Sequence, residues 1–129
     1  MLESPSFLSR GWNMRAILPI TVTLLLAGCA SSTMEAARNG APTARLDSHK
    51  TPDVVAQCIQ FSWQEESSFG VDASGYLEAR KQGGFTVYTR EAESFVDVYA
   101  QAGGTRVDYY ARQDDGMALR RRAAAATCL

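Results

Sequence analysis

Beyond residue 50, the spacing of apolar residues predicts two helices separated by four strands. Thr51, Pro52 and Asp53 are residue types typical of the first turn of a helix. Apolar residues then recur three and four positions apart as far as about Trp63, which is the spacing of one helical face. A second helix is expected over residues 117–129, because this stretch is rich in strong helix formers.

Residues 76–90 alternate between apolar and polar side chains around a Gly83-Gly84 pair, which predicts a β-hairpin. A two-residue loop at these glycines would mix polar and apolar side chains on both faces of the hairpin. A three-residue loop from Gln82 to Gly84 instead collects the apolar side chains on one face, and it is therefore preferred. That face holds Leu77, Ala79, Phe85 and Val87.

Residues 94–112 alternate in the same way, and here a two-residue Gly103-Gly104 turn separates the faces, with Ala100 opposite Val107. Joining the two hairpins gives a four-stranded antiparallel meander with one apolar face. The two helices are the only elements available to cover that face. The sequence therefore predicts, over residues 51–129, a two-layer α+β domain of order αββββα with both helices on one face of the sheet.

Residues 29–50 are poor in large apolar residues and have no clean period, which predicts a flexible tether ahead of the domain. The only histidine, His49, lies in this segment. A lone imidazole on a flexible segment is expected to be solvated rather than catalytic.

The apolar run over residues 16–27 has about 12 residues, which is shorter than the roughly 20 that a membrane-spanning helix needs. Arg15 precedes this run, and the small residues Ala27 and Gly28 follow it. Residues 1–28 are therefore predicted to be a signal peptide. Translation is expected to start at Met14, since residues 1–13 only add length before the signal.

The four residues Leu26-Ala27-Gly28-Cys29 resemble the lipobox of bacterial lipoproteins. The resemblance implies that the Cys29 thiol receives a diacylglycerol, that the chain is cut before Cys29, and that the new amino terminus is acylated with a fatty acid such as palmitate. Two or three acyl chains make a lasting membrane anchor. Ala30 after the cysteine implies the outer membrane, with the domain facing the periplasm. The alternative is an ordinary secretory signal in which Cys29 is incidental.

Lipidation of Cys29 would leave Cys58 and Cys128, which lie on the two helices expected to pack together. In an oxidising compartment this arrangement predicts a Cys58–Cys128 disulfide, and the alternative is two buried free thiols. Redox-active pairs usually lie close together as Cys-x-x-Cys, so a structural cross-link is favoured. The chain resembles, loosely, small uncharacterised proteobacterial envelope lipoproteins with a helix cysteine, a β-meander and a terminal cysteine. That resemblance implies a location and no activity.

The composition gives little support for an enzyme. The chain has 129 residues and a formal net charge of −1, which fits one domain and no nucleic-acid partner. The chain lacks the usual set of metal ligands and a phosphate-binding loop, so no metal and no cofactor are expected. The acidic pairs at 65–66 and 114–115 are expected to be solvated caps, and Arg120–Arg122 is expected on the wet face of the last helix.

The remaining candidate site is the sheet face that the two helices leave uncovered. It is expected to carry Tyr76, Arg80, Tyr88, Arg90, Phe95, Tyr99, Arg106, Tyr110 and Arg112. Tyrosine and arginine are enriched at recognition surfaces, although the same residues also form ordinary cross-strand pairs on a solvated face. The expected function is a non-enzymatic module that contacts an envelope protein or the cell wall. The alternative is a small-ligand or glycan-binding module, which a tyrosine-lined pocket would favour over a flat face.

Overall fold

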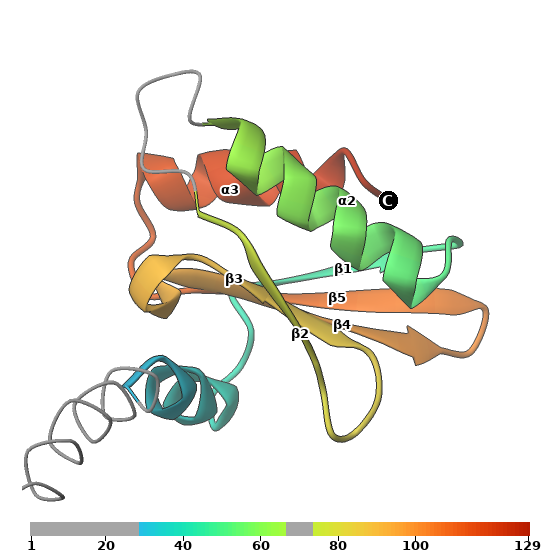
Figure 1. Cartoon of the computed structure of the whole chain (residues 1–129), viewed down its shortest axis with the longest axis horizontal. Coiled ribbons are helices and arrows are strands. Elements are labelled where there is room, and N and C mark those ends of the chain that lie inside the picture. Colours follow the sequence, from blue (N-terminus) through green and yellow to red (C-terminus); the bar gives the residue numbers. More distant parts are fainter. Residues whose placement is uncertain (1–28, 67–73) are drawn as a thin grey trace, which may run out of the picture.

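The computed structural model describes residues 29–66 and 74–129, which form an α+β fold around one sheet (Figure 1). A helix over residues 29–38, here called the N-terminal helical segment, comes first in the described part. The other elements are β1 (Ala44–Ser48), α2 (Pro52–Glu65), β2 (Tyr76–Ala79), β3 (Phe85–Tyr88), the short 3-10 helix η2 (Arg90–Ala92), β4 (Ser94–Gln101), β5 (Gly104–Ala111) and α3 (Gly116–Ala126). The predicted signal peptide, residues 1–28, lies outside the described residues.

The five strands form an open antiparallel sheet in the order β1-β5-β4-β3-β2. The predicted α+β class is confirmed, and α2 and α3 lie together on one face of the sheet, as expected (Figure 1). The apolar sheet face is also as predicted, because Val87, Val98 and Val107 are fully buried beneath the helices. Trp63 of α2 is buried there too, and its indole Nε1 donates a hydrogen bond of 3.0 Å to the Arg121 carbonyl oxygen of α3.

The predicted four-stranded sheet is wrong by one strand, because residues 44–48 of the expected tether form β1. This strand pairs with β5 from Ala44 opposite Tyr109 to Ser48 opposite Thr105. Only Ala44 and Leu46 of β1 pack against the core. So short a run carries too little apolar periodicity to predict a strand, and β1 is stabilised by a partner about sixty residues later in the chain.

The N-terminal helical segment, also expected to be tether, packs against the sheet face opposite α2 and α3 (Figure 1). Met34 is 2% exposed and forms a second small core with Ala92, Phe95 and Tyr110. The sheet therefore lies between helices on both sides. The fold has three layers, whereas two were predicted.

Both hairpin loops lie one residue earlier than predicted. In the first hairpin the Arg80 amide donates to the Gly84 carbonyl oxygen at 3.0 Å, so the loop is Lys81–Gly83. In the second, Gln101 pairs with Gly104, so Ala102 and Gly103 make the turn. A one-residue move of the loop shifts the strand register by two residues, which leaves every side chain on its predicted face.

The physical reason for both shifts is that the second glycine of each pair lies against a neighbouring strand. A Cβ atom on Gly84 would lie 2.1 Å from the Val98 carbonyl oxygen, and one on Gly104 would lie 2.1 Å from the Ser48 carbonyl oxygen. Their φ angles are +81° and +153°. These glycines are therefore required for close approach of the backbones, and the residues before them make the turns.

The predicted Cys58–Cys128 disulfide is present. Its S–S distance is 2.05 Å and its Cα–Cα distance is 5.7 Å, and it joins α2 to the residues just after α3. The two cysteines are 70 residues apart in the chain. The cross-link therefore holds together two helices that the four strands β2 to β5 separate in sequence.

Candidate functional site

The sheet face opposite α2 and α3, here called the polar face, carries side chains from all five strands. Along β4 and β5 these are Phe95, Asp97, Tyr99, Arg106, Asp108 and Tyr110. The N-terminal helical segment covers one end of this face, so the predicted Tyr/Arg site is not one continuous surface. It is divided into a covered part, an open part and a strand edge.

The covered part contains Phe95 and Tyr110, which are 2% and 8% exposed. Their rings are stacked, with centroids 4.5 Å apart and an interplanar angle of 7°. The guanidinium carbon of Arg38 lies 5.2 Å from the centroid of the Phe95 ring. Burial raises the pKa of Tyr110. The expectation that Phe95 and Tyr110 belong to an exposed binding surface is therefore wrong, because a helix that the sequence did not predict lies over them.

Arg38 also binds Asp97, which is buried near the middle of the polar face. Its Nε and Nη2 atoms donate to the two carboxylate oxygens of Asp97, each at 2.8 Å. Thr86 donates a third hydrogen bond to this carboxylate at 2.8 Å, and Arg80 Nε lies 3.7 Å from it. The hydrogen bond to Asp97 raises the pKa of Arg38 above its ordinary value. This bidentate ion pair between Arg38 and Asp97 fixes the N-terminal helical segment to the sheet.

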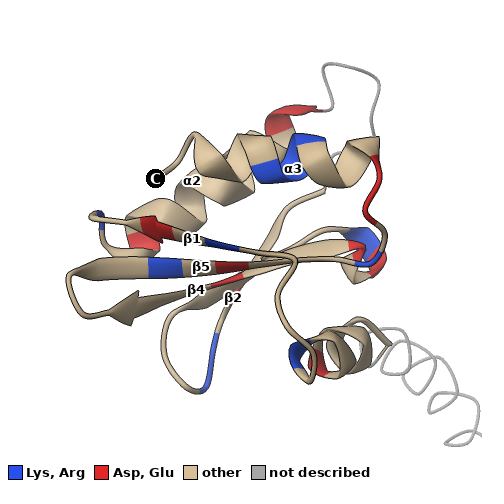
Figure 2. Cartoon of the chain, turned by 180° about the vertical axis from the view of Figure 1, so that it is seen from behind, with Lys and Arg blue, Asp and Glu red and all other residues tan. Residues whose placement is uncertain are grey.

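Asp108 lies directly opposite Asp97 in the β4–β5 register. Figure 2 shows basic and acidic positions close together along β1 and β5. The Tyr99 hydroxyl donates to Asp108 Oδ2 at 2.8 Å. Asp108 Oδ1 is buried and has no hydrogen-bond partner among the described residues, and Arg45 Nε lies 3.5 Å from it. Two like charges opposite each other destabilise a sheet, so the arginines around the pair offset that repulsion.

The open part of the polar face contains Tyr99, Arg80 and Arg106. The Arg80 guanidinium lies 5.2 Å from the centroid of the Tyr99 ring, and Arg106 Nε lies 3.2 Å from Asp47 Oδ1. Burial is the main cause that raises the pKa of Tyr99, and its hydrogen bond to Asp108 adds to it. Arg80 and Tyr99 also line a groove of about 470 Å³ beside the β2–β3 loop.

The remaining predicted residues lie at the margins. Tyr76 and Tyr88 meet on β2 and β3, with ring centroids 5.3 Å apart. Arg90 belongs to η2, and its backbone amide donates to the Ser74 hydroxyl. Arg112 Nη2 donates to the Glu91 carbonyl oxygen at 2.7 Å. Arg90 and Arg112 therefore belong to the turn around η2, while the two tyrosines pack at the sheet edge.

Sequence reasoning missed the buried Asp97 and its partner Arg38. A signal for the helix that carries Arg38 was present, because Met34, Ala37 and Arg38 have the three- and four-residue spacing of one helical face. Residues 34–38 are also good helix formers. Because residues 29–38 contain no other large apolar residue, this short pattern was not recognised as a helix.

Cys29 is exposed and unpaired at the start of the described segment. None of the helices in residues 29–66 and 74–129 is long and apolar enough to span a bilayer. Within these same two ranges, no group of three or more histidine, cysteine, aspartate or glutamate side chains is arranged to hold a metal ion.

No family model, curated protein or solved structure matches this chain. No relative therefore supplies an activity, a ligand or a partner for the polar face.

Proposed function

We propose that this chain is a lipid-anchored protein of the bacterial envelope, without enzymatic activity, whose small domain binds another envelope protein or the cell wall. The anchor is lipidated Cys29 in the outer membrane, and the domain faces the periplasm. The observation that carries the location is the order of features ahead of Cys29: Arg15, an apolar run too short to span a bilayer, and Ala27-Gly28.

The packing of the N-terminal helical segment bears on how the domain would stand at the membrane. Met34 and Arg38 hold this helix against the polar face. At 1.5 Å per residue of helix, Met34 lies only about 8 Å along the axis from Cys29. An anchored domain would thus be held close to the lipid surface, in contrast to the long tether expected from sequence.

The open part of the polar face supports a macromolecular partner better than a small ligand. Of the predicted tyrosines only Tyr99 lines the groove of about 470 Å³, while Tyr76 is 46% exposed at the sheet edge. Aromatic and arginine side chains spread over an exposed surface are typical of protein interfaces. The groove keeps glycan or small-ligand binding as the second candidate function, since Arg80 and Tyr99 supply a cation and an aromatic ring to it.

Mass spectrometry of the protein purified from membranes tests the anchor. The expected amino terminus is a diacylglyceryl Cys29 with an added acyl chain, and a Cys29→Ser variant should be released from the membrane. An unmodified Cys29 thiol, or an intact residue 1–28 segment, would overturn the proposed anchor.

Crosslinking in cells tests the partner. A photoreactive amino acid at Tyr99 should capture a partner, whereas the same group at Gln57, an exposed position on α2, should not. Equal capture at both positions would contradict a partner bound at the polar face. Saturable binding of a soluble glycan that Tyr99→Ala abolishes would favour the second candidate function instead.

A further inference from the structure

The last helix carries a buried arginine that the proposed function does not use. Arg120–Arg122 was expected on the wet face of this helix, yet the side chain of Arg121 is only 9% exposed. Arg121 lies on the same helical face as Ala118 and Ala125, which are also buried. A guanidinium at a core position is costly unless it is well paired.

The guanidinium of Arg121 makes only long, weak polar contacts. Its Nη1 atom lies 3.4 Å from the Ser94 hydroxyl oxygen and 3.5 Å from a carboxylate oxygen of Glu93. Nε and Nη2 have no hydrogen-bond partner among the residues that the structure describes, and neither atom is sealed from solvent. The Arg121 side chain as a whole is therefore nine-tenths buried, and most of its donors have no partner among the described residues.

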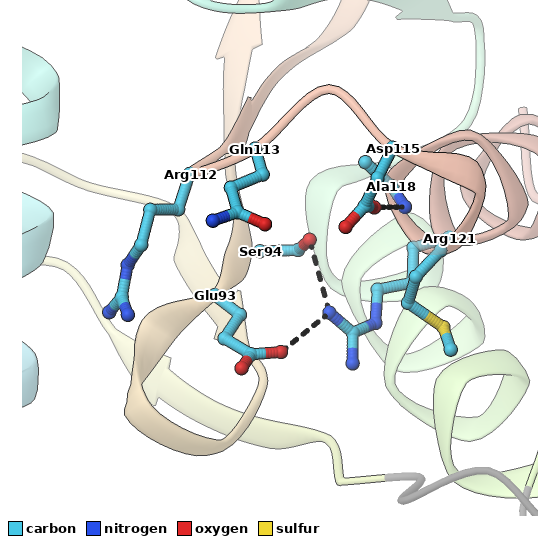
Figure 3. A pocket seen from close by; sticks show the side chains of 8 residues that line it. Glu93, Ser94, Arg112, Gln113, Asp115, Ala118 and Arg121 are labelled. Atoms are coloured by element: carbon cyan, nitrogen blue, oxygen red, sulfur yellow. Dashed lines mark hydrogen bonds and ion pairs between the residues drawn. The ribbon is translucent and has the colours of Figure 1, made fainter.

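Arg121 lines a cavity of about 120 Å³ at the junction of η2, the end of β5 and the start of α3, and its Nη1 atom points toward Ser94 and Glu93 (Figure 3). The lining includes Glu93, Ser94, Gln113, Asp115 and Arg121. Arg112 also borders the cavity, but in Figure 3 its side chain points away from Arg121, and its Nη2 donates to the Glu91 carbonyl oxygen. Arg121 is thus the cation that this cavity offers to a ligand.

The backbone on the other side of the cavity is held in an uncommon conformation. Glu91 and Ala92 have φ angles of +58° and +53°, in the left-handed region that non-glycine residues seldom adopt. The Arg112 contact to Glu91 and the burial of Ala92 hold this turn in place. The turn brings Glu93 and Ser94 up to the guanidinium (Figure 3).

We propose that this cavity is a binding site for a small molecule that carries a single carboxylate, which the Arg121 guanidinium receives in the position that the Glu93 carboxylate now occupies. Planar carboxylates match the fork of a guanidinium. The Glu93 side chain is 54% exposed and its carboxylate lies at the long distance of 3.5 Å from Arg121 Nη1, so it leaves this position when the ligand binds. The acids Glu93 and Asp115 in the lining disfavour a doubly charged anion such as phosphate.

Titration of the folded protein with acetate, at constant ionic strength, tests this site by NMR. The indole N–H of Trp63 is a built-in reporter, since it donates to the Arg121 carbonyl oxygen. Acetate should shift this signal and the Ser94 and Ala118 amides saturably. Inorganic phosphate should bind at least tenfold more weakly than acetate. A shift that grows linearly without saturation, or phosphate binding as tight as acetate binding, would overturn the proposal.

Variants separate binding from structure. Arg121→Met should abolish the saturable shift, while Arg122→Met, which removes the same charge from an exposed position on α3, should keep it. Glu93→Gln removes the competing carboxylate and should tighten acetate binding about fivefold, while Glu91→Gln should leave it unchanged. If Arg121→Met does not fold, the Glu93 and Glu91 pair still decides the question. Unchanged or weaker acetate binding by Glu93→Gln would contradict displacement.

Discussion

Replacement of Arg38 by methionine should strongly destabilise the protein, although Arg38 comes from a segment that looks like a linker in the sequence. The change removes both hydrogen bonds of 2.8 Å to Asp97, a residue that is 3% exposed. The buried carboxylate would keep only the Thr86 hydroxyl and Arg80 at 3.7 Å, and it would still face Asp108.

The expected cost follows from the geometry of this pair. Removing one partner of a buried ion pair costs about 3–5 kcal/mol, and the remaining contact with Arg80 places Arg38→Met near 3 kcal/mol. For a domain of this size such a loss lowers the melting temperature by about 15 °C. Arg45→Met is the matched control, because Arg45 is 61% exposed and 3.5 Å from Asp108, and it should cost under about 1 kcal/mol.

Urea denaturation followed by circular dichroism measures these differences. The double variant Arg38→Met with Asp97→Asn no longer buries a carboxylate that has lost its main partner, so it should recover most of the lost stability. If Arg38→Met stays within about 1 kcal/mol of the parent protein, or if the double variant is no more stable than the single one, the buried pair does not hold the N-terminal helical segment.

Three further outcomes are expected. Replacing both Cys58 and Cys128 by serine should cost about 4 kcal/mol on the loop-entropy estimate for a 70-residue separation, and an unchanged melting temperature would refute it. Gly104→Ala should destabilise by over about 2 kcal/mol, because its Cβ would meet β1, whereas Gly103→Ala has open space and should cost about 1 kcal/mol; equal losses in thermal melts would contradict this. The raised pKa of Tyr99 means that the folded state favours the neutral phenol, so its contribution to stability is full below pH 10 and is lost as pH rises above that value. Tyr99→Phe should show a shallower alkaline loss in denaturation curves.

The parts of the fold that depend on local patterns could be predicted from the sequence. The three- and four-residue spacing that ends near Trp63 identified α2, and alternation identified four of the five strands with their correct faces. The cysteine count led to the Cys58–Cys128 disulfide. Each of these inferences needs only neighbouring residues or the placement of two helices on one face.

The parts that depend on distant partners could not be predicted. β1 has only two residues that pack against the core and is held by β5, while the N-terminal helical segment depends on Phe95, Asp97 and Tyr110. The hairpin registers were missed because Gly84 and Gly104 serve neighbouring strands rather than their own turns. The polar face was therefore predicted as open, although a helix covers one end of it.

The same reasoning failed for Arg121, for a different physical reason. Three consecutive arginines on a helix are about 100° apart around its axis and span about 200°, so they point in clearly different directions. In this helix Arg121, the middle one, points toward Ser94 of β4 and is buried. The identity of the residue that turns inward depends on the starting point of α3, which is fixed by the Asp115 cap that accepts the Ala118 amide at 2.9 Å.

The order of the strands also governs how the molecule behaves at high concentration. The two outermost strands, β1 and β2, have five and four residues, whereas the eight-residue strands β4 and β5 are interior. Unpaired strand edges recruit other chains into aggregates, and short edges that carry charged residues resist this. Arg45 and Asp47 provide that charge on β1, and Glu78 provides it on β2. Copies of the chain at high concentration should consequently resist polymerising edge to edge.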